Sequence, residues 1–107
     1  MNPNAVTKSL LAEAFLLQSI MEIFTLYILH SKKLDRFYIG FTSQTPEERL
    51  LKHLSAKKGF TATAKDWRIV YTETFLDKRL ATKREREIKK WKSSLKIKEL
   101  IERSSTE

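Results

Sequence analysis

The strongest constraint on the fold comes from one stretch, FTLYILHSKKLDRFYIGFT, at residues 24–42. Two apolar runs flank a basic segment rich in turn formers. Successive side chains of a strand point to opposite faces, so each run has one fully apolar face and one mixed face. Tyr27 lies on the mixed face of the first run and Tyr38 on that of the second. The stretch therefore predicts a β-hairpin, and antiparallel pairing would place both tyrosines on one face of the sheet.

A helix is predicted directly after the hairpin. Thr45 is a favourable N-cap, Pro46 suits the first helical position, and Glu48 completes a capping box. Arg49 and His53 lie four residues apart, so one is stacked a turn above the other on the same helical face. The segment AKKGFTATAKD that follows is interpreted as a basic loop.

The second half of the chain predicts one strand and two helices. The run WRIVYTETF, residues 67–75, is rich in β-branched and aromatic residues and predicts a third strand. Asp77 can cap a helix over residues 78–92, and a last helix is expected over residues 94–103. The fold class is therefore α+β, with a small three-stranded antiparallel sheet flanked by helices in the order β-β-α-β-α-α.

The first twenty residues are expected to form an N-terminal extension, either helical or disordered, ahead of a folded domain at residues 21–104. Its apolar part, residues 9–20, is shorter than the ~18 residues that cross a bilayer, so no membrane span is expected. This part could instead dock a second copy of the chain or a protein partner. The chain has no cysteine, which fits a reducing, cytoplasmic location.

Positive charge is concentrated near the C-terminus. The formal charge is +8, and residues 78–103 contain eleven Lys or Arg and four Glu, a net +7. A basic surface on one element attracts a polyanion, most often nucleic acid. A solvated, lysine-rich helix face is the structural alternative, and a basic helix on an anionic membrane is a weaker one.

Glu85 is the unusual acidic residue of the basic helix at residues 78–92. Helical geometry places it between Ala81 and Ile88, at the edge of the apolar stripe. A carboxylate there is either paired or bound to something. The favoured i,i+4 pair with Lys89 would explain it structurally, just as plain packing would explain Tyr27 and Tyr38.

Taken together and in order, these residues resemble the GIY-YIG nuclease superfamily. The likeness rests on Tyr27-Ile28, Tyr38-Ile39-Gly40, Arg49, His53 and Glu85, and it covers residues 22–92. The chain is most similar to small stand-alone members with one nuclease domain, related to the N-terminal nuclease domain found in excinuclease ABC.

The chain departs from the family pattern at three positions. Thr25 replaces the glycine that names the first half of the motif. Phe41 stands where some relatives have a lysine, and Leu54 stands where many small members have an asparagine.

The resemblance implies a metal-dependent endonuclease that hydrolyses DNA, including branched or damaged DNA, in repair or processing. Glu85 would hold a single Mg²⁺ or Mn²⁺, because carboxylate oxygen is a preferred ligand of these hard cations. Arg49 would clamp the scissile phosphate. Either Tyr27 or Tyr38 would orient or deprotonate water, with His53 as an auxiliary base or hydrogen-bond partner. The residues expected to hold the flanking backbone are Lys57, Lys58, Lys65, Lys83, Arg84 and Lys89. The alternative is a non-catalytic nucleic-acid-binding module on the same scaffold.

Overall fold

The computed structural model describes residue 13 and residues 22–106. The N-terminal extension expected over residues 1–20 lies outside the described residues, apart from Glu13. The division of the chain at residue 20 therefore stays a prediction. No helix of the described part is long and apolar enough to cross a membrane.

The predicted fold class and element order are confirmed. The three strands form one antiparallel sheet in the order β2-β1-β3. Three α-helices and a short 3-10 helix complete the domain. In chain order the elements are β1 (Phe24–Ser31), β2 (Arg36–Thr42), α2 (Pro46–Leu54), η1 (Phe60–Thr63), β3 (Arg68–Phe75), α3 (Lys78–Trp91) and α4 (Ser94–Thr106).

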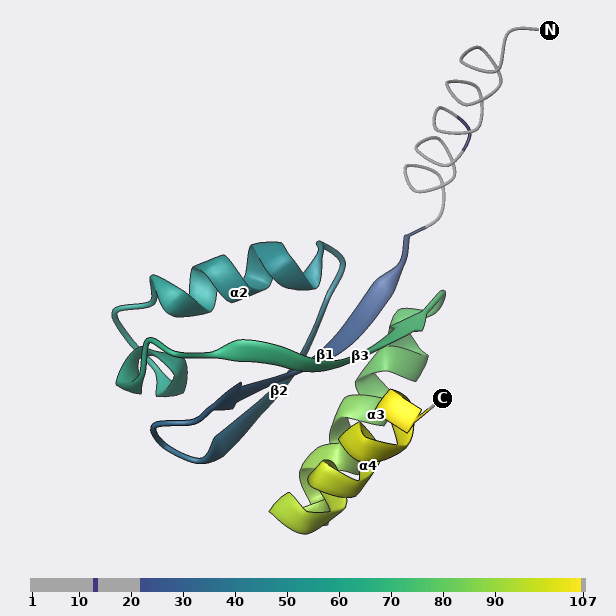
Figure 1. Ribbon diagram of the computed structural model, residues 1–107. Coiled ribbons are helices and arrows are strands. Elements are labelled where there is room, and N and C mark those ends of the chain that lie inside the picture. The colour runs from purple at the N-terminus through teal and green to yellow at the C-terminus, as the bar shows by residue number, and fades with distance from the viewer. Residues whose placement is uncertain (1–12, 14–21, 107) are drawn as a thin grey trace, which may run out of the picture.

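The sheet is covered on both faces (Figure 1): α2 lies over one face, and the paired helices α3 and α4 lie over the other. The core under α3 and α4 is built from Leu26, Ile28, Ile39, Ile88, Ile97 and Leu100. The core on the α2 side contains Tyr27, Leu29, Ala64 and Trp67. The mixed, tyrosine-bearing face of β1 is thus a second interior, because β1 is the central strand and α2 packs against it.

The strand register brings the two tyrosines onto one face, as the alternation predicted. Tyr27 pairs with Gly40, and Leu29 pairs with Tyr38, so the tyrosines are diagonal neighbours. The pairing of β1 with β3 shifts by one residue between Ile28 and Leu29. Such a bulge bends the strand and re-aims the side chains that follow it.

Both predicted helix caps are present. The Thr45 hydroxyl accepts a hydrogen bond from the Glu48 amide at 3.2 Å, and the Asp77 carboxylate accepts one from the Arg79 amide at 2.8 Å. At the other end of α3, Lys92 adopts a left-handed conformation with φ of 47°. This conformation ends the helix and turns the chain back into α4.

The segment after α2 differs from the loop that the sequence suggested. Residues Phe60–Thr63 form the 3-10 helix η1, which begins after Gly59 at a φ of 86°. The Trp67 indole N–H donates to the Thr61 carbonyl at 2.9 Å, and the Phe60 and Trp67 rings lie 5.7 Å apart. Trp67 is buried, so this short helix is fixed by a tertiary contact that local sequence does not reveal.

Candidate active site

A buried chain of hydrogen bonds links three elements. The Tyr27 hydroxyl on β1 is 2.9 Å from Nε2 of His53 on α2. Nδ1 of the same imidazole is 3.0 Å from the hydroxyl of Thr61 on η1. The three residues are 1%, 7% and 5% exposed, respectively. Buried polar groups are costly unless they are paired, so this chain fixes the orientation of each of its members.

Burial and Arg49 set the protonation of this chain. Burial lowers the pKa of His53 below its usual value, and the nearby positive charge of Arg49 lowers it further. Burial raises the pKa of Tyr27, the Arg49 guanidinium opposes the rise, and the Tyr38 and Glu85 charges add to it. At neutral pH His53 is therefore a neutral imidazole, and Tyr27 is an uncharged phenol.

Tyr38 completes a compact aromatic group with these residues. Its ring centroid is 4.6 Å from that of His53 and 6.3 Å from that of Tyr27. Arg49 lines a pocket of about 370 Å³ that also includes Thr42 and Lys78. Four of the five predicted catalytic residues, Tyr27, Tyr38, Arg49 and His53, are thus gathered on the α2 side of the sheet.

Glu85 reaches the site from α3, the helix layer on the other face of the sheet. Its side chain is 18% exposed, and it accepts a hydrogen bond from the Lys89 ammonium at 3.1 Å. Its charge contributes to the raised pKa of Tyr27, so the two groups are within electrostatic range. The ion pair that would explain Glu85 structurally is therefore present, and the carboxylate also bears on the tyrosine.

The acidic groups permit one kind of metal site. Within residues 22–106 and residue 13, no three His, Cys, Asp or Glu side chains cluster to form a cage for a metal ion. Mg²⁺ is usually held by one or two carboxylates together with waters and substrate phosphate oxygens. A single part-buried carboxylate such as Glu85 fits a divalent cation that takes its other ligands from water and substrate.

Gly40 allows the close approach of Tyr27 to the neighbouring strand. A Cβ atom at residue 40 would lie 2.7 Å from the Tyr27 hydroxyl oxygen and 2.9 Å from its Cζ atom. It would also lie 3.2 Å from Cε1 of Tyr38. Any larger residue would collide with the ring that carries the hydroxyl, so the third residue of Tyr38-Ile39-Gly40 has a steric reason.

We expect Gly40→Ala to lower the free energy of unfolding by about 1–3 kcal/mol, because the added methyl group overpacks a filled site. Urea denaturation measures the loss. The same substitution in a Tyr27→Leu background provides the control, since removing the ring should make the alanine nearly neutral. An unchanged free energy of unfolding for Gly40→Ala alone would contradict the steric argument.

The cations expected to bind nucleic acid fall into two groups. Lys57 and Lys58, after α2, and Lys83, on α3, are exposed, and each is without an ion pair to the described residues. Lys65 is also exposed, but its ammonium donates to the Ala56 carbonyl at 2.7 Å and ties together the ends of the segment between α2 and β3.

Arg84 and Lys89 are engaged within the protein. The Arg84 guanidinium is 3.2 Å from the Glu73 carboxylate and 3.3 Å from that of Glu87, and it lies 5.7 Å from the centre of the Trp91 ring. Lys89 pairs with Glu85. The structure thus gives Arg84 a role in joining α3 to β3.

Thr61 is the residue of the site that sequence reasoning missed. It lies in a segment interpreted as a loop, where no periodicity identifies an inward-facing position. Its eight-residue separation from His53 is not a helical spacing. Only the docking of η1 against Trp67 brings its hydroxyl to the imidazole.

Comparison with protein families agrees with this arrangement. The family model described as the GIY-YIG catalytic domain matches residues 23–98, well over half of the chain. Neither the curated proteins nor the solved structures gave a match. GIY-YIG domains are nuclease domains that generally use divalent metal ions and act on DNA. The matched range contains every residue of the site described above, and the chain therefore belongs to the GIY-YIG catalytic domain family.

Proposed function

We propose that this protein is a metal-dependent endonuclease that hydrolyses DNA phosphodiester bonds in DNA repair or processing. The observation that carries the proposal is the buried Tyr27–His53–Thr61 chain beside Arg49. Such a chain can move a proton at a fixed position, and the adjacent guanidinium can hold a phosphate there. Plain packing of two strands and a helix requires neither group.

Arg49 is the phosphate clamp in this proposal. A guanidinium stays charged at all physiological pH values, and its planar fork matches two phosphate oxygens. The pocket of about 370 Å³ that Arg49 lines is open to a substrate group from solvent. A phosphate bound there would lie close to Tyr27, because the Arg49 charge already lowers the pKa of that phenol.

Tyr27 and His53 are the proton-handling pair. We assign the proton of His53 to Nδ1, from which it is donated to the Thr61 hydroxyl, so that Nε2 accepts from Tyr27. As Tyr27 takes a proton from the attacking water, it passes its own proton to Nε2 at 2.9 Å. The lowered pKa of His53 keeps the imidazole neutral and able to accept that proton.

Glu85 would hold the Mg²⁺ or Mn²⁺, and Lys89 would release the carboxylate when the cation binds. The bound cation supplies positive charge for the phosphate oxygens and the leaving oxygen. Tyr38 supports the geometry, because its ring packs against the His53 imidazole.

A cleavage assay tests the proposal. We expect purified protein to cut at least one of a panel of branched, nicked and single-stranded DNAs when Mg²⁺ or Mn²⁺ is present. EDTA should abolish cutting, and excess Mg²⁺ should restore it, because a single carboxylate holds the cation weakly. If the protein binds these DNAs but cuts none of them with either metal, the alternative of a non-catalytic binding module replaces the enzyme.

A further inference from the structure

The solvent face of α3 carries a straight row of four cations, which we name the α3 stripe: Arg79, Lys83, Arg86 and Lys90. Their spacing of i, i+4, i+7 and i+11 keeps them on one side of a helix. The opposite side carries Ala81 and Ile88, both of which are fully buried. Packing of that side against the sheet therefore holds the α3 stripe toward solvent.

The charge of the α3 stripe is largely uncompensated within the described residues. Lys83, Arg86 and Lys90 have no ion pair there. Arg79 pairs with Asp77 at 3.3 Å but keeps a side chain that is 92% exposed. The nearby Glu87 is already bound by Arg84 at 3.3 Å. Uncompensated cations in a row fit a polyanion with charges at a similar repeat.

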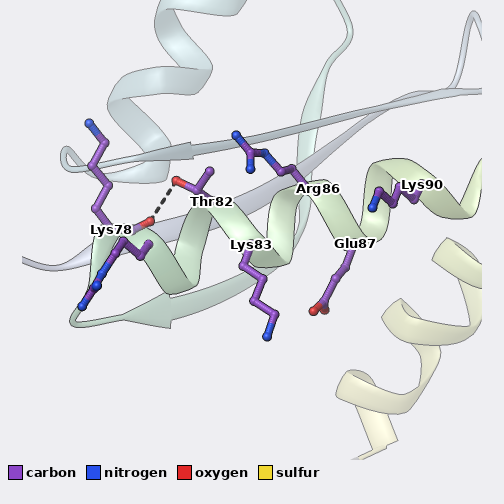
Figure 2. Close-up of a pocket in the computed structure, with 7 residues that line it drawn as sticks. Lys78, Thr82, Lys83, Arg86, Glu87 and Lys90 are labelled. Carbon is purple, nitrogen blue, oxygen red and sulfur yellow. Dashed lines mark hydrogen bonds between the residues drawn. The ribbon is translucent and has the colours of Figure 1, made fainter.

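A groove runs along this face of the helix. It has a volume of about 710 Å³ and is lined by Lys78, Arg79, Thr82, Lys83, Arg86, Glu87 and Lys90. In Figure 2 Lys78, Thr82 and Arg86 extend to one side of α3, and Lys83 and Glu87 extend to the other. From Lys78 to Lys90 the helix rises ~18 Å. One DNA strand carries a charge about every 3.4 Å along the duplex axis, so about five phosphates would span this length.

Lys78 connects this groove to the candidate active site. It lines the α3 groove and also lines the smaller pocket that contains Arg49. On the helix Lys78 lies two turns from Glu85 on the same flank, since the two are seven residues apart. A strand whose phosphate is held by Arg49 can therefore pass Lys78 and continue onto the α3 stripe.

We propose that the α3 stripe is a track for the DNA backbone that flanks the cleaved bond, entered from the Arg49 pocket by way of Lys78. This inference rests on the proposed nuclease function. The track reads no bases, because long flexible cations contact phosphates and position the strand without discriminating sequence. Of the cations on α3, the structure assigns Lys83, Arg86 and Lys90 to DNA, whereas Arg84 and Lys89 serve internal pairs.

The salt dependence of DNA binding tests the track. The probes are a 20-base-pair duplex and a 20-nucleotide single strand, measured by fluorescence anisotropy in EDTA so that no cutting occurs. We expect the triple variant Lys83→Gln, Arg86→Gln, Lys90→Gln to bind about 10²-fold more weakly at 0.1 M salt. Its slope of log K against log salt should be shallower by about 2–3 for at least one probe, because three phosphate contacts are lost.

A variant with the same change in charge provides the control. Lys32→Gln, Lys33→Gln, Lys96→Gln alters the β1–β2 turn and α4, away from the groove, and should change the slope by less than about one. If the wild type binds with a steep slope and the α3 triple variant keeps that slope, the track is wrong and the nuclease proposal stands. If the wild type binds neither probe, the nuclease proposal fails together with the track. Thermal melting confirms that both variants are folded.

Discussion

Replacing Tyr27 with phenylalanine is expected to slow DNA cleavage by about 10²–10⁴-fold, the usual contribution of a positioned acid–base group. The substitution removes one oxygen and keeps the ring that packs over Gly40. It also leaves Nε2 of His53 without its partner at 2.9 Å, in a site where Tyr27 is 1% exposed. The rate of a single turnover at saturating Mg²⁺ measures the effect on chemistry.

Tyr38→Phe is the matched control for this experiment. It makes the same chemical change on the neighbouring ring, which contacts His53 through its face. We expect a loss of less than about tenfold, since the Tyr38 hydroxyl is not part of the buried chain. A Tyr38→Phe protein that loses more activity than Tyr27→Phe would exchange the roles of the two tyrosines. Melting curves separate loss of chemistry from the cost of about 1–3 kcal/mol expected for an unpaired buried nitrogen.

Replacing Glu85 with glutamine is expected to lower cleavage by about 10²–10³-fold, comparable to the loss of one electrostatic group at a reacting centre. The amide keeps the size of the side chain but removes the charge that would hold a divalent cation. The remaining activity should require a higher Mg²⁺ concentration. Rates measured over a Mg²⁺ titration therefore distinguish weaker metal binding from slower chemistry.

Loss of the Glu85 ion pair should leave the fold intact. The pair with Lys89 lies on the helix surface, where the lysine is 53% exposed, so it contributes less than about 1 kcal/mol. Glu87→Gln makes the same change on the same helix and removes the pair with Arg84 instead. It should retain near-normal cleavage. A Glu85→Gln protein that cuts as fast as the parent protein would show that Glu85 is not the metal ligand.

Local patterns predicted most of the fold because their causes are local. The alternation in residues 24–42 requires only that successive side chains of a strand point to opposite faces. Thr45 and Asp77 marked two helix starts, because an unpaired N–H group in the first turn needs a nearby acceptor. The bulge between Ile28 and Leu29 was not predicted, because it depends on how β3 pairs with the central strand.

The candidate site was predicted as a set of residues but not as a geometry. The spacing of Arg49 and His53 placed both on one helical face. Which face of the sheet that helix would cover depends on the packing of α2, and this packing encloses Tyr27 completely. The burial raises the pKa of Tyr27 and lowers that of His53, and neither direction follows from residue types alone.

The sequence by itself determined the strands, the helix caps and the order Tyr27, Tyr38, Arg49, His53 and Glu85 that identifies the family. The tertiary structure alone decided that Thr61 holds the imidazole, that Arg84 and Lys89 are engaged within the protein, and that Lys78 joins two pockets. The reason is physical. Periodicity and capping act over a few residues of one segment, whereas burial, ion pairing and pocket shape arise where segments distant in sequence pack together.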